Sequence, residues 1–140
     1  MRRIRLDSSV LVAAFIARGL CTDLLRLVLA EHDPVNPEIV AEEVRYLLGK
    51  ERKADPAALS SADAVFERCS SVPDEDVSCP ITLRDPDEKR VLAGALAAGV
   101  QVLVTGNQGL LVAADESPIR ILSPRAGPTL ARHVLTRDRY

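Results

Sequence analysis

The segment VQVLVT, residues 100–105, limits the folds open to this chain more than any other stretch. It is almost wholly apolar and rich in valine, and the turn residues Gly106 and Asn107 follow it directly. Such a run is typical of a strand that is buried on both faces, as strands in parallel sheets are. Residues 4–6 and 119–122 are shorter strand-like segments, and helical stretches separate them. This alternation predicts an α/β fold of three layers, in which helices cover both faces of a central parallel sheet.

Helical segments are predicted from apolar residues at helical spacing and from the residues that begin and end helices. Ser8 or Ser9 is expected to cap the first helix, and Thr22 the second. Pro37 is expected to begin the third helix, which ends at Gly49. The helices are expected at 10–17, 23–32, 37–48, 56–68, 89–98 and, as one or two turns, 110–114, with a further short strand or extended segment at 77–83.

A chain of 140 residues has the size of a single domain. We place this domain at residues 1–125, followed by a basic tail or short helix at 126–140. The net charge of −2 excludes nucleic-acid binding by bulk positive charge, although not by a local patch. No apolar run approaches the ~20 residues that cross a bilayer, and Asp7 interrupts the stretch that resembles a signal peptide. We therefore expect a cytoplasmic protein with no membrane association.

The three cysteines, Cys21, Cys69 and Cys79, are odd in number and form no CxxC pair. This pattern suits a reducing compartment and argues against a zinc site. His32 and His133 lie far apart in the sequence and match no metal or catalytic spacing. We expect the cysteines to be small buried hydrophobic residues.

Polar residues that follow the predicted strands are candidates for function, because ligands of parallel α/β sheets bind outside the carboxyl ends of the strands. Asp7 directly follows residues 4–6, and Asn107 comes shortly after residues 100–105. Thr105, at the end of that strand, is either a core residue or a hydroxyl that reaches the site. Asp7 also suits a helix N-cap, and Asn107 also suits a turn between two neighbouring glycines.

An acidic segment containing Asp85, Asp87 and Glu88 lies at the start of the fifth predicted helix. Acidic residues are common there because they interact favourably with the helix dipole. One of the three is also a candidate ligand for a site at the sheet edge. Arg84, which precedes them, is a candidate for contact with phosphate.

Glu43 is the candidate from the third predicted helix. It lies four residues from both Ile39 and Leu47, so it shares the apolar face of that helix. A carboxylate beside a core-facing surface is unusual unless it has a partner. Glu42 lies about 100° away around the helix and is the alternative if the helix is rotated from the expected position.

If these carboxylates converge, they form a site of strong negative charge. Two carboxylates about 5 Å apart repel by roughly 3 kcal/mol at an effective dielectric constant of 20. Such a group either takes up protons or binds a cation, and oxygen ligands completed by water suit Mg²⁺ or Mn²⁺. A metal held in this way can generate hydroxide and stabilise the charge on a phosphate during in-line displacement. The residues therefore indicate a metal-dependent phosphodiesterase.

The order of several short motifs resembles that of the PIN domain family. LDSSVLVAAF resembles the opening of these domains, EIVAEEVRYLL their second acidic helix, and RDPDEKRVLAGALAAG their third acidic stretch. VLVTGNQGLL and IRILSP resemble the two motifs that end the domain. The resemblance covers residues 4–124 and is closest to bacterial toxin components of the family. It implies helices around a parallel sheet, and four acidic positions that bind Mg²⁺ or Mn²⁺ and cut single-stranded RNA.

Matched position by position, the resemblance assigns four metal ligands, of which the three acids are also catalytic: Asp7, Glu43, Glu88 and Asn107. The candidates for substrate contact are Ser9, Thr105 and Arg84. Glu88 stands where the family has Asp and is one methylene longer. Asn107 also replaces an Asp and lacks its charge, although its amide oxygen can still coordinate a metal. Ser9 stands where the family usually has Asn.

Two functions follow from this resemblance. One is an active Mg²⁺- or Mn²⁺-dependent endoribonuclease, the toxin of a toxin–antitoxin pair, which forms a homodimer and whose cleft is filled by the tail of a small antitoxin. The other is a degenerate PIN-like module that binds RNA or a protein partner without cutting, which Asn107 and Glu88 motivate. A third class, an α/β regulator with a phosphoacceptor Asp, is disfavoured because no Lys follows a late strand.

Overall fold

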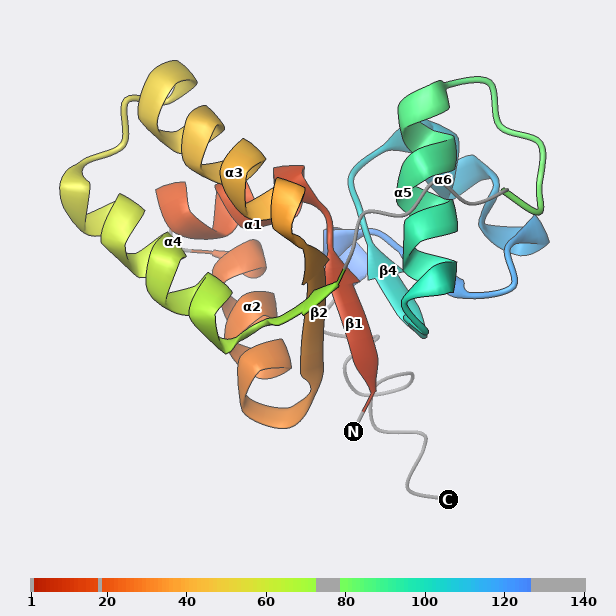
Figure 1. Cartoon of the computed structure of the whole chain (residues 1–140), viewed down its shortest axis with the longest axis horizontal. Helices are drawn as coiled ribbons and strands as arrows, with labels where there is room; N and C mark the ends of the chain where they lie inside the picture. Colours follow the sequence, from red (N-terminus) through yellow and green to blue (C-terminus); the bar gives the residue numbers. More distant parts are fainter. Residues whose placement is uncertain (1, 18, 73–78, 127–140) are drawn as a thin grey trace.

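The computed structural model describes residues 2–17, 19–72 and 79–126. In these residues five strands form one parallel sheet in the order β3-β2-β1-β4-β5 (Figure 1). The strands are Arg3–Leu6 (β1), Asp33–Pro37 (β2), Ser70–Val72 (β3), Val102–Val104 (β4) and Arg120–Leu122 (β5). The α-helices are Ser8–Ile16 (α1), Leu20–Glu31 (α2), Glu38–Tyr46 (α3), Pro56–Arg68 (α4), Pro86–Ala97 (α5) and Gln108–Val112 (α6). Shorter helical turns are Leu47–Glu51 (η1), Ala114–Glu116 (η2) and Pro124–Ala126 (η3).

Helices cover both faces of the sheet, which confirms the predicted α/β fold. The helices α1 to α4 lie on one side, and α5 and α6 lie on the other (Figure 1). Side chains alternate across a strand, so a single strand supplies both layers. In β4, Val102 and Val104 pack in the apolar cluster of α1 to α4, whereas Leu103 packs in the cluster of α5 and α6. The strand β4 has no polar face because helices cover both of its faces.

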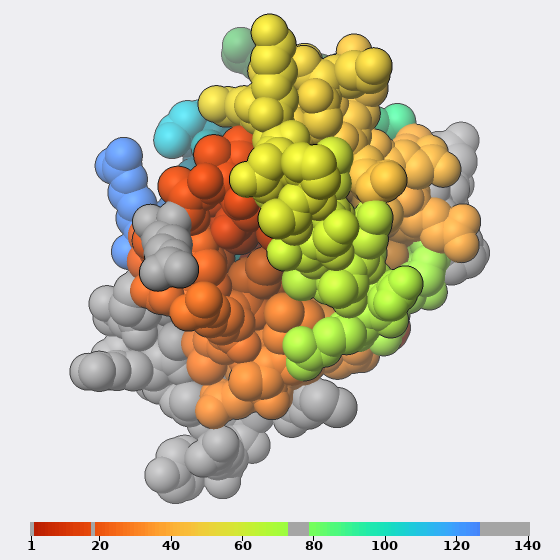
Figure 2. Space-filling view, turned by 90° about the vertical axis from the view of Figure 1, so that its left-hand side faces the viewer, coloured from red at the N-terminus to blue at the C-terminus, as the bar shows by residue number. Residues whose placement is uncertain are grey.

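The outer surface of the first layer is formed largely by α2 and α4 (Figure 2). At the end of α4, Arg68 donates from Nη2 to the backbone oxygen of Leu29 in α2 at 3.3 Å. Arg45 of α3 pairs with Asp63 of α4 at 2.7 Å, and both side chains are exposed. Exposed ion pairs contribute at most about 1 kcal/mol, so apolar packing is the main source of stability in this layer.

Several elements agree closely with the expectations from the sequence. The fourth helix matches its predicted range of 56–68, and β4 and β5 fall within the predicted strands. The start of α4 could be predicted because the residues that begin this helix are adjacent in the sequence. Asp55 is the N-cap residue, its Oδ1 accepts from the backbone N–H of Ala58 at 2.9 Å, and Pro56 occupies the first helical position.

The strand β2 lies where the local sequence predicts a turn and the beginning of a helix. Pro34 and Pro37 disfavour a strand because proline has no N–H to donate. In the fold, however, β2 lies between β1 and β3, with Val35 opposite Ser70. Strands from distant parts of the chain pair with it on both sides, and this tertiary context outweighs the local preference. As a consequence α3 begins at Glu38, one residue later than expected.

The expectation that Thr22 caps the second helix was wrong. The helix α2 begins earlier, at Leu20, with Gly19 in the cap position. The hydroxyl of Thr22 donates to the backbone oxygens of Ala14 at 2.9 Å and Ala17 at 2.7 Å. Thr22 therefore satisfies carbonyls at the end of α1 rather than N–H groups at the start of α2, because the link between the two helices is short.

Two further boundaries differ from expectation. The third helix continues beyond Gly49 through the π-helical turn η1, where the fully buried Leu48 packs in the core. Of the segment 77–83, expected as a short strand or an extended segment, the described part, residues 79–83, contains no strand, and β3 lies directly after α4.

The predicted basic tail lies outside the described residues, apart from residue 126 in η3. Among the helices that the structure describes, none has both the length and the apolar character needed to span a bilayer.

Candidate functional site

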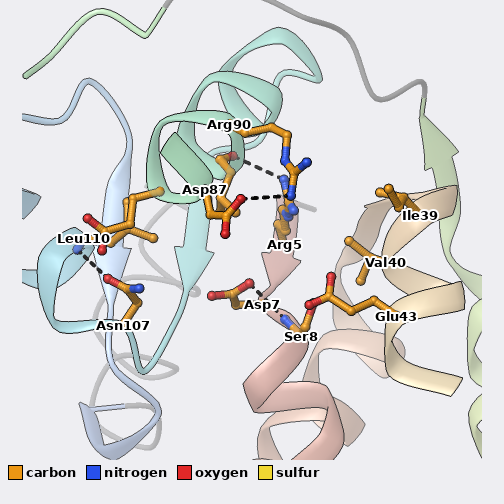
Figure 3. A pocket seen from close by; sticks show the side chains of 12 residues that line it. Arg5, Asp7, Ser8, Ile39, Val40, Glu43, Asp87, Arg90, Asn107 and Leu110 are labelled. Atoms are coloured by element: carbon orange, nitrogen blue, oxygen red, sulfur yellow. Dashed lines mark hydrogen bonds and ion pairs between the residues drawn. The ribbon is translucent and has the colours of Figure 1, made fainter. Parts of the chain in front are cut away.

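A cleft of about 180 Å³ opens at the carboxyl end of β1, between α3 on one side and α5 and α6 on the other (Figure 3). β1 and β4 are parallel neighbours, so the residues that follow them meet at the same edge of the sheet. Polar side chains enter from the end of β1, from α3, from the first turn of α5 and from the turn after β4. The acidic and amide side chains that line the cleft are Asp7, Glu43, Asp87, Glu88 and Asn107.

Asp7 is held firmly at the centre of this cleft. Its Oδ1 accepts from the backbone N–H of Ser8 at 2.9 Å, and its Oδ2 accepts from the hydroxyl of Thr105 at 2.7 Å. Asp7 is also the N-cap residue of α1, a role for which the sequence offers Asp7 as well as Ser8 and Ser9. The two interpretations of Asp7 are compatible, because one carboxylate both caps the helix and faces the cleft.

Thr105 links the two strand ends that form the site. Its side chain is fully buried, and its hydroxyl donates to Asp7 and accepts from the backbone N–H of Asn107 at 3.0 Å. It does not line the cleft itself. This position makes Thr105 a residue that orients Asp7, and it differs from the predicted contact with substrate.

Asn107 lines the cleft and also begins α6. Its Oδ1 accepts from the backbone N–H of Leu110 at 3.0 Å, which is the usual arrangement of an N-cap side chain (Figure 3). An amide oxygen has two lone pairs, so this bond leaves one for a further partner. The turn role and the candidate ligand role of Asn107 are therefore compatible in geometry.

The three acidic residues at the start of α5 have different roles. Asp85 caps the helix, with its Oδ1 accepting from the backbone N–H of Asp87 at 2.8 Å, and it does not line the cleft. Asp87 lines the cleft but pairs with Arg90 at 3.3 Å, and its side chain is 82% exposed. Glu88 is half-buried and lines the cleft. Glu88 is thus the better placed of the two remaining candidates.

Glu43 and Ile39 lie on the face of α3 that borders the cleft (Figure 3). The helical repeat places both residues on one face, as expected, but that face is a cleft wall rather than core. Ile39 is accordingly 43% exposed, whereas Val40 beside it is buried. Glu42, the alternative from the sequence, does not line the cleft.

Ser9 and Arg84, which the sequence suggested for substrate contact, do not line this cleft. Ser9 lies about 100° around α1 from Ser8 and lines a second cavity of about 350 Å³ between α1 and η1. Arg84 is exposed and precedes the helical turn that carries the acidic side chains.

The sequence did not indicate three of the polar residues that line the cleft: Arg5, Ser8 and Arg90. Arg5 lies in the central strand β1, is only 6% exposed, and donates from Nη1 to the backbone oxygen of Val91 in α5 at 3.2 Å. A charged residue between Ile4 and Leu6 in a buried strand was the signal that could have identified it. Arg90 carried no signal distinct from other surface charges.

The donors fit a hard divalent cation by their chemistry. They are carboxylate and amide oxygens, which suit Mg²⁺ and Mn²⁺, and the cleft has room for bound water. In the described part of the chain, no three Asp, Glu, His or Cys side chains are gathered closely enough to share one ion. Glu43 is exposed, and rotation of its long side chain can bring its carboxylate towards Asp7, whereas Glu88 is half-buried at the cleft wall.

The cysteines have no place in this site. Cys21, Cys69 and Cys79 are free thiols that are partly exposed rather than fully buried as expected. Burial raises the pKa of the Cys21 and Cys69 thiols, so both favour the protonated form. A raised pKa disfavours the thiolate, which is the form that acts as a nucleophile or metal ligand.

Comparison with known proteins gives two findings. A family model described as a PIN domain matches residues 3–109, a segment that contains all four candidate ligands. Among solved structures, the chain is similar to the crystal structure of VapBC2 from Rickettsia felis bound to a DNA fragment from their promoter. The TM-score is 0.61 and the identity 16%, and the alignment covers 86% of this chain and 98% of that chain, so the likeness is one of fold. No curated protein matches the sequence.

Proposed function

This chain belongs to the PIN domain family, whose model matches residues 3–109, and on that basis we propose that it is a metal-dependent endoribonuclease that cleaves single-stranded RNA. The observation that carries the proposal is the convergence of Asp7, Glu43 and Glu88 on one cleft from three separate elements. Asn107 is the proposed fourth ligand. Oxygen donors of this kind suit Mg²⁺ or Mn²⁺.

The residues of the cleft have different roles in the proposed reaction. Asp7 is the most firmly oriented ligand, because Ser8 and Thr105 hold both of its oxygens. A divalent ion bound here would supply hydroxide near neutral pH and offset the negative charge of a phosphate. Arg90 is proposed to contact the RNA phosphates. Its pair with Asp87 is exposed and therefore weak, so a phosphate can compete for the guanidinium.

Cleavage assays with single-stranded RNA test this proposal. We expect cleavage in Mg²⁺ or Mn²⁺, its loss when a chelator is added, and its recovery when the ion is restored in excess. Cleavage that persists at full rate in chelator would contradict the role given to the metal. RNA that binds tightly but stays intact in both ions would contradict the nuclease and support the alternative below.

The alternative is a degenerate PIN-like module that binds RNA or a protein partner without cleavage. Two observations motivate this alternative. Asn107 carries no charge and its oxygen already caps α6, and no three acidic side chains of the described residues are gathered around one point. The cleavage assay separates the two functions because only the nuclease predicts cleavage products.

We also propose a small antitoxin protein as a partner and a homodimer as the oligomeric state. The support is the likeness of fold to the VapBC2 structure. Co-expression with the product of an adjacent small gene is the test, followed by sedimentation of the complex. Failure of any neighbouring small protein to co-purify or to inhibit cleavage would argue against the toxin role but not against the nuclease.

A further inference from the structure

Gly109, in the first turn of α6, is in unusually close contact with Glu88. A Cβ atom added at Gly109 would lie 2.6 Å from Cδ of Glu88 and closer still to both of its carboxylate oxygens. Ordinary contacts of a Cβ atom begin at about 3.4 Å. Any side chain at position 109 would therefore occupy the space that the Glu88 carboxylate fills.

We propose that Gly109 is the positioning residue for Glu88, and that the missing side chain at this position is what lets a glutamate reach the cleft from α5. The inference rests on the proposed function, because Glu88 matters there as a metal ligand. Glu88 is one methylene longer than the aspartate that the family resemblance leads one to expect. The extra length needs space on the opposite side of the cleft, and Gly109 supplies it.

The backbone itself does not require glycine at this position. Among the described glycines, Gly99 is the one in the left-handed region of φ, whereas Gly109 has the conformation of a helix, which any residue can adopt. Glycine within a helix is less favourable than alanine, because it loses more conformational freedom on folding. The position therefore carries a residue that weakens α6 without any conformational need for it.

The other described glycines meet no comparable obstruction. A Cβ at Gly49 would lie 4.0 Å from Leu59, and one at Gly94 would lie 3.5 Å from Nη1 of Arg5, both ordinary contacts. The clash at Gly109 also involves the far end of a flexible side chain rather than backbone. A new methyl group can therefore be accommodated by rotation of Glu88, with the fold intact and the carboxylate displaced.

A double-mutant cycle with Mn²⁺ as the probe tests the proposal. Calorimetry of the full chain should show that Gly109→Ala weakens Mn²⁺ binding by about tenfold, the scale seen when a metal ligand loses its support. In the Glu88→Asp background the same substitution should change the affinity by less than about twofold, because the shorter side chain does not reach position 109. The thermal midpoint should stay the same or rise in both backgrounds.

Gly49→Ala is the matched control, since it makes the same change in a helical turn away from the cleft and should leave Mn²⁺ binding unchanged. Equal losses of affinity from Gly109→Ala in both backgrounds would overturn the proposal, because Glu88 would then not mediate the effect.

Crystal structures of the natural chain and of Gly109→Ala provide a readout that is independent of metal and of activity. We expect the Glu88 carboxylate to leave its place against α6 in the variant, and an unmoved carboxylate would overturn the proposal. If the natural chain binds no Mn²⁺ and cuts no RNA, the proposed function fails, yet the two structures still decide whether Gly109 positions Glu88.

Discussion

Replacing Asp7 by asparagine should reduce RNA cleavage at least about 100-fold, an increase of ~2.7 kcal/mol in activation free energy, while the fold remains intact. Asparagine is as good an N-cap residue as aspartate, so α1 keeps its cap. The Thr105 hydroxyl can accept from the new amide as readily as it donates to the carboxylate. What disappears is the negative charge at the centre of the cleft. The substitution therefore separates the two roles of this side chain.

The measurements are initial cleavage rates, Mn²⁺ affinity and the thermal midpoint, made on the same preparations. Asp55→Asn is the matched control, because Asp55 also caps a helix through its carboxylate but lies at the start of α4 and does not line the cleft. It should leave cleavage unchanged, and the difference between the two variants excludes a contaminating nuclease that both preparations share. If the Asp7→Asn variant cuts RNA at the natural rate, the role of Asp7 as a catalytic metal ligand is wrong.

Replacing Val102 by alanine should lower the free energy of unfolding by about 2 kcal/mol, from the lost burial of two methyl groups and the cavity left behind. Val102 is 0% exposed and lies in β4, next to β1 at the centre of the sheet. For a chain of this size the loss corresponds to roughly 8 °C in the thermal midpoint.

Val112→Ala is the matched control, because it removes the same atoms from a valine that is 81% exposed. It should change the stability by less than about 0.5 kcal/mol. Denaturant unfolding of both variants gives the difference directly. Similar losses from the two substitutions would mean that β4 is not the core strand described above.

The candidate site could be predicted in part because its acidic residues follow rules that are local in the chain. Asp7 directly follows one strand and Asn107 comes shortly after another, and parallel strands bring their carboxyl ends to one edge. Glu43 shares a helix face with Ile39 through the helical repeat. These relations need only the strand and helix assignments. The roles of Thr105 and Asp85 could not be predicted in this way, because each depends on which neighbouring N–H or oxygen the folded chain brings within reach.

The sequence by itself determined the fold class and the family of this protein, and it named most of the polar residues that line the cleft. It could do so because apolar periodicity and helix end signals act over a few residues, and the order of motifs is retained along the chain. Only the tertiary structure decided that β2 is a strand, that Arg5 and Arg90 border the cleft, and that Glu88 rests against Gly109. Each of these depends on contacts between segments far apart in the chain, whose energies a local pattern does not contain.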